Sequence, residues 1–298
     1  MRKCLLTTAA FGFLALPANA ADLAPFYKAP VPIPICAWCG IYFGLNAGGT
    51  WSSDNSLNVT SGVAGDFLPG PASFGAASAA GATGRVPVGG RAGFIGGGQI
   101  GYNLQLSNAW IAGLETDIQG ATSSSSNGSV ATSVGPIGFF GNPDIVTTSI
   151  GATKQLDYFG TLRGRLGYLF GPAFLAYGTG GLAYGGVKAS TSIGQTNSDC
   201  SFTPPACIQP STSSSGAISQ TRVGWTAGAG MEWLFASRWS AKVEYLYYDL
   251  GSVTFANGPL VTGINTFPGV GGPAVVNSTS STEFKGNLVR VGVNYRWP

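Results

Sequence analysis

Residues 156–170, LDYFGTLRGRLGYLF, decide the fold because two kinds of side chain alternate along them. Successive side chains of an extended strand point to opposite faces. One face then carries mainly apolar side chains, and the other is polar. The apolar face holds Leu156, Tyr158, Leu162, Leu166, Tyr168 and Phe170, and the polar face holds Asp157, Thr161, Arg163 and Arg165. The stretch predicts a β-strand with one apolar and one charged face.

Seven further segments show the same period-two pattern, and together the eight predict an all-β chain. The predicted strands cover approximately 38–51, 94–106, 109–121, 154–170, 174–188, 219–235, 238–250 and 283–297. The connections after the second, fourth and sixth strands are tight turns, at Ser107-Asn108, Gly171-Pro172-Ala173 and Ala236-Ser237. The other connections are long and rich in Ser, Thr, Gly and Asn, at roughly 52–93, 122–153, 189–218 and 251–282.

This strict alternation of short turns and long loops is typical of outer-membrane barrels, which have short periplasmic turns and long extracellular loops. Each segment is long enough to cross a bilayer as a tilted strand of about 9–11 residues. The sequence therefore predicts an eight-stranded, antiparallel, up-and-down transmembrane β-barrel.

The polar faces of the strands together collect five acids and six bases. The acids are Glu115, Asp117, Asp157, Glu232 and Glu244, and the bases are Arg163, Arg165, Arg222, Lys242, Arg290 and Arg296. These charges fit two placements. They could face water around a soluble barrel with an aromatic core, or they could face the lumen of a barrel whose aromatic residues touch lipid.

The positions of the tryptophans favour the second placement. Trp38, Trp110, Trp233, Trp239 and Trp297 all fall at strand ends on the predicted periplasmic side. Tryptophan prefers the membrane–water interface, whereas a soluble core would hold its largest side chains in mid-strand. The charges are then expected to pair across a lumen that eight strands leave just wide enough for side chains to fill. We expect poor conduction or none, and a structural and surface role; the alternative is a narrow porin for passive diffusion of small solutes.

Composition excludes several other classes of protein. Only 9% of the residues are charged, and the net charge of +3 is too weak for a nucleic-acid-binding surface. The chain contains no histidine, the commonest catalytic base and metal ligand. The stretch from Gly96 to Gly101 fits the G-x-G-x-x-G pattern but continues as strand on both sides, so it lacks the helix that a nucleotide site needs. We expect no enzyme activity, no cofactor and no metal site.

The first residues have the features of a secretory signal peptide. A basic start, an apolar run from Cys4 to Leu16 and the small residues before Ala21 fit a signal over residues 1–20. The apolar run is shorter than the roughly 20 residues of a spanning helix. A Pro-rich periplasmic lead is expected at 21–37, followed by the barrel domain at 38–298.

Four cysteines remain after residue 20. Cys200 and Cys207 lie in the third long loop, and an oxidising compartment favours a disulfide between them. Cys36 and Cys39 form a C-x-x-C at the entrance of the first strand. A redox motif would need a thioredoxin-like βαβ context, and a zinc site would need two further ligands. A local disulfide or two free thiols are the alternatives that remain.

The predicted strands resemble the small outer-membrane β-barrel proteins of alphaproteobacteria, the porin-family surface antigens. The matching segments are 42–48, 93–103, 113–120, 160–168, 224–232 and 239–251. The resemblance implies an OmpA-like barrel with antigenic extracellular loops, a role in envelope integrity and host contact, and outer-membrane lipids and surface ligands as partners. The C-terminus is similar to the signal that the barrel-assembly machinery reads, with Arg290, Gly292, Tyr295 and Trp297 matching and Pro298 departing from it.

Overall fold

The computed structural model describes residues 36–65, 74–89, 92–122, 126–139, 142–198, 211–262 and 273–297. The predicted signal peptide, most of the predicted lead, and Cys200 and Cys207 lie outside these ranges. In sequence order the elements are β1 (Gly40–Ser52), β2 (Ser56–Gly65), α1 (Phe74–Gly81), β3 (Gly84–Pro87), β4 (Gly93–Gln105), β5 (Trp110–Thr122), β6 (Ser126–Phe139), β7 (Asn142–Phe170), β8 (Phe174–Ser198), β9 (Ser211–Ala236), β10 (Trp239–Ala256), β11 (Leu260–Thr262) and β12 (Ala274–Arg296).

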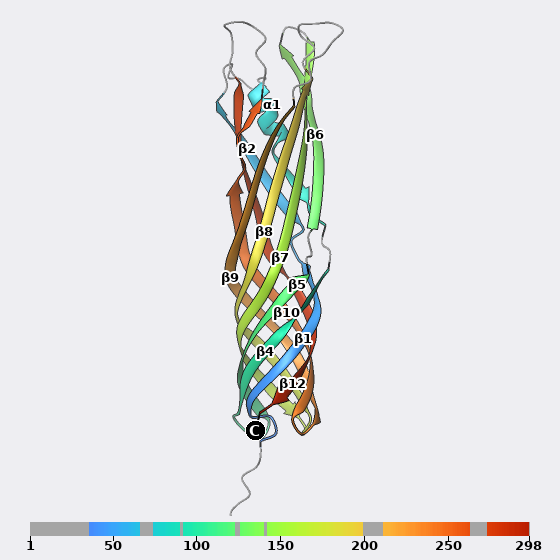
Figure 1. Cartoon of the computed structure of the whole chain (residues 1–298), viewed down its shortest axis with the longest axis vertical. Coiled ribbons are helices and arrows are strands. Elements are labelled where there is room, and N and C mark those ends of the chain that lie inside the picture. The colour runs from blue at the N-terminus through green and yellow to red at the C-terminus, as the bar shows by residue number, and fades with distance from the viewer. Residues whose placement is uncertain are drawn as a thin grey trace, which may run out of the picture. The chain divides into compact units, whose positions relative to one another are not determined.

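Eight strands close into a ring, which confirms the predicted fold class. The order around the ring is β1-β4-β5-β7-β8-β9-β10-β12, and β12 pairs back onto β1. Every pairing is antiparallel, and closure is seen at Tyr42, which lies opposite Arg296 on one side and Gly101 on the other. Three tight turns join β4 to β5, β7 to β8 and β9 to β10 at one end of the ring, which we call the turn end (Figure 1).

Five strands, β7, β8, β9, β10 and β12, run on past the other end of the ring. There they meet four strands of the predicted loops, β2, β3, β6 and β11. In this upper tier β6 pairs with β7, β2 pairs with β12, and β3 pairs with β2 (Figure 1). The prediction that all of residues 52–93, 122–153, 189–218 and 251–282 are loops is therefore wrong in part. The missed strand residues alternate buried apolar with exposed small polar side chains, as at Ile150 and Ser149, and their composition is typical of loops.

The outer face of the ring is apolar. Leu45, Leu114 and Val223 are each more than 60% exposed, although a soluble protein buries such residues. Aromatic side chains form a band at the turn end, with Trp110 against Tyr168 and Phe174 stacked on Trp233. A second band at the junction with the upper tier includes Trp51 and the contacting rings of Trp225 and Tyr247. Two aromatic bands around an apolar belt are the pattern of a membrane-spanning barrel.

Candidate functional site

Nine charged side chains fill the lower lumen of the ring. Inward positions of five strands supply them: Glu115 and Asp117 from β5, Arg163 and Arg165 from β7, Glu232 from β9, Lys242 and Glu244 from β10, and Arg290 and Arg296 from β12. Each is at most 4% exposed. The period of two puts them on the inner face, and closure of the ring brings their strands together.

The middle layer of the lumen is electrically balanced, with Glu115, Asp117 and Glu244 facing Arg163, Lys242 and Arg290. Arg163 places its Nη1 2.9 Å from Glu244 and its Nη2 2.5 Å from Glu115. Lys242 Nζ lies 2.8 Å from Glu115, and Arg290 Nη2 lies 2.8 Å from Asp117. Because each charge contacts opposite charges, the desolvation cost of burying it is offset.

A second layer of charges lies closer to the turn end. There Arg165 and Arg296 both contact Glu232, at 3.2 and 2.7 Å. Ser240 and Asn294 donate hydrogen bonds to the same carboxylate, at 2.5 and 3.0 Å. We call this group the bottom layer, and one contact of 3.6 Å between Arg165 and Glu115 links it to the middle layer.

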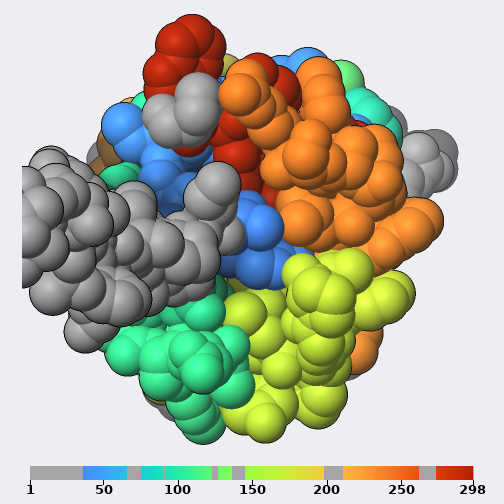
Figure 2. Space-filling model, turned by 90° about the horizontal axis from the view of Figure 1, so that it is seen from below, coloured from blue at the N-terminus to red at the C-terminus, as the bar shows by residue number. Residues whose placement is uncertain are grey.

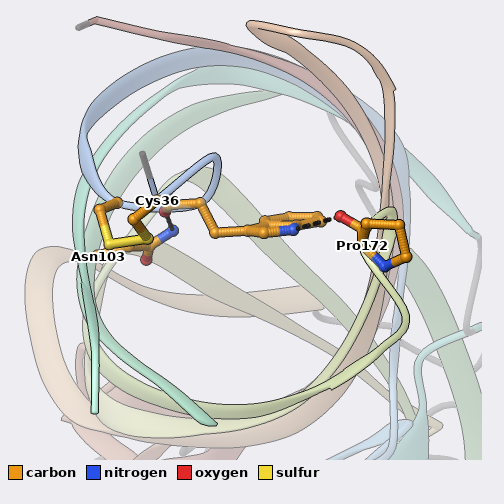
Figure 3. The surroundings of a disulfide bond; sticks show 5 residues. Cys36, Asn103 and Pro172 are labelled. Carbon is orange, nitrogen blue, oxygen red and sulfur yellow. Dashed lines mark hydrogen bonds between the residues drawn. A yellow bond between two sulfur atoms is a disulfide. The ribbon is translucent and has the colours of Figure 1, made fainter. Parts of the chain in front are cut away.

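Trp38 closes the turn end from inside. Cys36 and Cys39 form a disulfide that bounds a tight loop, and the loop directs the indole across the lumen to donate to Pro172 O at 3.0 Å (Figure 3). Asn103 Nδ2 donates a hydrogen bond to the backbone carbonyl of Trp38 at 3.1 Å, and the Trp38 ring packs with Leu175. Seen from this end, the N-terminal part of the described chain lies in the middle, among the turns (Figure 2).

Trp38 therefore does not belong to the interfacial aromatic band where the sequence placed it. It is 3% exposed and lies inside the barrel. The turn at Cys36–Cys39 is the cause, and Gly40, with a φ of 98°, lets the chain pass from that turn into β1.

The upper lumen is closed by apolar side chains rather than by charges. Phe159, Leu246, Leu250 and Leu288 begin a buried cluster that continues into the upper tier. The helix α1 contributes to this cluster through Ala79. Gln195 on β8 donates to Ser78 O at 2.8 Å and so ties the helix to the barrel wall.

Two of the predicted luminal residues lie outside the charged lower lumen. Asp157 is the extra residue of a β-bulge between Leu156 and Tyr158, so it turns outward to Lys188 at 2.7 Å, while Leu156 turns inward. Arg222 is half-buried and lies apart from the nine charged side chains of the lower lumen. It donates a hydrogen bond to Ser252 O at 2.9 Å, beside the bulge at Gly251 in β10.

Sequence reasoning placed Thr161 on the inner face but missed several other uncharged members of the lower lumen. Tyr42 donates to Glu115 at 2.7 Å, Tyr177 donates to Glu244 at 3.1 Å, and Asn103 accepts from Arg165 at 2.9 Å. Gly101 makes room for the ring of Tyr42, because a Cβ there would lie 2.2 Å from that ring. Gln99 and Asn103 alternate with Ile100 and Tyr102 along the strand, and this alternation could have placed both polar side chains on the inner face.

Lys154 is a buried cation of the upper tier that the sequence did not single out. Its Nζ donates to Asp54 O at 2.9 Å and to the carbonyl of Glu283, and it lies 4.9 Å from the centre of the Phe284 ring. Burial lowers the pKa of this amine to about 8, against the opposing charges of Asp54 and Glu283. It joins β7 to the β1–β2 turn and to β12.

The residues of the predicted assembly signal divide between the two faces of β12. Arg290 points into the lumen, and Gly292 is buried where a Cβ would lie 2.9 Å from Leu45 O. Tyr295 contacts Trp239 with ring centroids 5.1 Å apart, and Trp297 is 61% exposed in the aromatic band of the turn end.

Neither a membrane-spanning helix nor a metal cluster is found in the part of the chain that the structure describes. Its helix, α1, has eight residues, too few to cross a membrane. Within the same ranges, no three His, Cys, Asp or Glu side chains gather where they could hold a metal ion.

Comparison with known proteins identifies relatives along the full length of the chain. The family described as "Outer membrane protein beta-barrel domain" matches residues 6–296. The 31 kDa outer-membrane immunogenic protein of Brucella melitensis is 33% identical over 300 residues, covering 100% of both chains. The 22 kDa outer membrane protein of Rhizobium leguminosarum is 30% identical over 171 residues, covering 54% of this chain and 59% of its own. Among solved structures, OprG from Pseudomonas aeruginosa aligns with a TM-score of 0.35 and 11% identity, over 87% of this chain and 98% of its own.

Proposed function

The chain belongs to the outer membrane protein β-barrel family, and from this premise we propose that it is a closed structural barrel that carries surface-exposed loops and conducts no solutes. The turn end then faces the periplasm, and the upper tier stands above the outer leaflet. The long strands β7, β8 and β9, with 29, 25 and 26 residues, exceed the roughly 9–11 that a bilayer requires.

The observation that carries this proposal is the series of three closures along the lumen. Trp38 covers the periplasmic mouth, the paired charges fill the lower lumen, and the apolar cluster fills the upper lumen. An ion on this path would have to displace paired charges and then cross a cluster lined mainly by apolar side chains. Both steps cost several kcal/mol.

The test is single-channel recording with the refolded full-length protein in planar bilayers. We expect no reproducible conductance steps, whereas a general porin in the same membranes gives stable ones. A Trp38→Gly variant is the matched control. We expect no conductance steps from it either, because the charged and apolar closures remain. Stable steps from the wild-type protein would refute the proposal and favour the narrow porin.

The surface role is supported by the upper tier and by the description of the Brucella relative as immunogenic. We expect antibodies against residues 199–210 to label intact cells that express the protein. Labelling that requires permeabilised cells would contradict the predicted orientation. Surface ligands and outer-membrane lipids are the partners that this role implies.

The C-terminal residues are proposed to direct assembly through the barrel-assembly machinery. Deletion of residues 295–298 removes Tyr295 and Trp297 from the outer face of β12, and we expect the heat-modifiable, membrane-inserted form to be lost. Wild-type amounts of that form after the deletion would contradict this role. A Pro298 deletion alone serves as the control and is expected to insert normally.

A further inference from the structure

The buried charges of the lower lumen are not balanced, and the imbalance is local. Five cations face four anions in total, which leaves one surplus positive charge. The three acids and three bases of the middle layer cancel. The surplus therefore lies in the bottom layer, where Arg165 and Arg296 share the single carboxylate of Glu232.

The same two arginines hold donors that the protein leaves unused. Arg165 Nη2 and both Nε and Nη1 of Arg296 are buried with no hydrogen-bond partner among the described residues. The side chains of both arginines are at most 4% exposed. Guanidinium groups desolvated without partners cost free energy, so such donors point to an acceptor that is not part of the chain.

Aromatic rings surround the two guanidinium groups. The ring of Trp38 covers Arg296, with 4.2 Å between the guanidinium carbon and the ring centre. The rings of Tyr42 and Tyr177 flank Arg165 at 4.8 and 5.1 Å. The Nε of Arg165 donates a hydrogen bond to Asn103 Oδ1. These cation–π contacts stabilise the guanidinium groups, and the rings exclude water, so the low local dielectric strengthens the attraction of the remaining N–H donors for an anion.

We propose that the bottom layer binds one small monovalent anion of the halide class, held by Arg165 and Arg296 beneath Trp38. One negative charge neutralises the surplus, which a water molecule cannot do. A divalent anion would reverse the imbalance, and the enclosing rings select against large organic anions. This inference goes beyond the structural role, since a closed barrel could fold with or without the ion.

Crystals of the full-length protein grown in bromide test the site directly. We expect an anomalous peak next to the guanidinium groups of Arg165 and Arg296. Ordered water at that position, with no anomalous signal, would overturn the proposal.

Stability measurements test the same site in solution. We expect the urea midpoint of the barrel in vesicles to rise to a plateau as chloride replaces gluconate at constant ionic strength. In Asn103→Asp, a carboxylate supplies the missing charge beside Arg165, and the chloride effect is lost. In Arg238→Gln, which changes an exposed arginine at the same end, the effect remains. A chloride effect of equal size in Asn103→Asp would overturn the proposal.

Discussion

At the scale of single residues, Glu115 is the side chain on which most of the lower lumen converges. Its carboxylate contacts Lys242, Arg163 and Arg290, and it accepts the hydrogen bond of Tyr42. Five strands of the ring, β5 with β1, β7, β10 and β12, are thereby connected through one buried group. A barrel with so few charges concentrates them where they join strands far apart in the sequence.

Replacing Glu115 by Gln leaves its cations without their shared anion. We expect the free energy of unfolding in vesicles to fall by about 3–5 kcal/mol, the usual cost of breaking a buried ion pair. The control is Glu283→Gln, which removes only an exposed pair with Lys285, and solvent-exposed pairs contribute little to stability. Equal losses in the two variants would show that the network does not stabilise the barrel.

Lys154 gives a prediction about pH. Its folded-state pKa of about 8 lies below the ordinary value of 10.5, so between these values the unfolded chain binds more protons than the folded one. The contribution of this group to stability therefore rises with pH across that window. The free energy of unfolding of wild type minus that of Lys154→Met should rise by up to about 3 kcal/mol between pH 7 and pH 10.5. This follows from about 1.4 kcal/mol per unit of pKa difference.

Lys285→Met is the control for that experiment, because the contribution of Lys285 to stability changes with pH in the opposite direction to that of Lys154. The hydrogen bond to Glu283 raises the pKa of Lys285, so its stabilising contribution is present at low pH and is lost as the pH rises through the folded-state pKa. Urea unfolding of both variants and wild type at the two pH values gives the comparison. A flat difference between Lys154→Met and wild type would mean that Lys154 is not desolvated.

At the scale of elements, the bulges in β7 and β10 mark where the ring passes into the upper tier. The β7 bulge at Asp157 lies between the end of pairing with β5, at Tyr158, and the start of pairing with β6, at Lys154. The extra residue keeps Lys154 and Leu156 inward on one side and Phe159 inward on the other.

Deleting Asp157 is therefore expected to be tolerated. Leu156 and Tyr158 already face consecutive residues of β8, Val187 and Gly186, so the deletion leaves every other side chain on its present face. The lost ion pair with Lys188 is exposed and worth at most about 1 kcal/mol. We expect near-wild-type heat modifiability and urea midpoint.

The matched deletion of Gln155 should not be tolerated. It leaves Leu156 facing outward and turns Asp157 into the apolar upper lumen, at a cost of several kcal/mol for an unpaired buried charge. If the two deletions behaved alike, the assignment of Asp157 as the extra residue would be wrong.

At the scale of the whole molecule, the ring and the upper tier distribute apolar and polar side chains in opposite ways. The ring exposes apolar side chains and buries charges, whereas the upper tier buries Ile150 and Val187 and exposes serine and threonine. The surrounding medium changes from lipid to water along one set of continuous strands. The position of that change is marked by Trp51 and Trp225.

Fluorescence quenching checks this arrangement. In vesicles of brominated lipid, we expect strong quenching of a chain whose sole tryptophan is Trp233, which is 50% exposed in the lipid-facing band. A chain that keeps only Trp38 should be quenched little, because its indole lies inside the barrel. Equal quenching of the two would contradict the closure of the turn end by Trp38.

The sequence by itself determined the eight strands, their alternation and most of the residues that share the charged face. These follow from the period of two and from turn chemistry, which act over a few neighbouring residues. Nine of the eleven residues predicted for the lumen, among them Arg163 and Glu244, lie together there.

The tertiary structure alone decided which charges meet, where the strands end and what closes the lumen. Pairing of Glu115 with Lys242 depends on ring closure between strands distant in the chain. A bulge reverses facing with one residue, as at Asp157, and composition does not reveal it. The strand extensions form because they pair with one another and with β2, β6 and β11 in the folded barrel. Their serine- and threonine-rich segments have no strong local preference of their own.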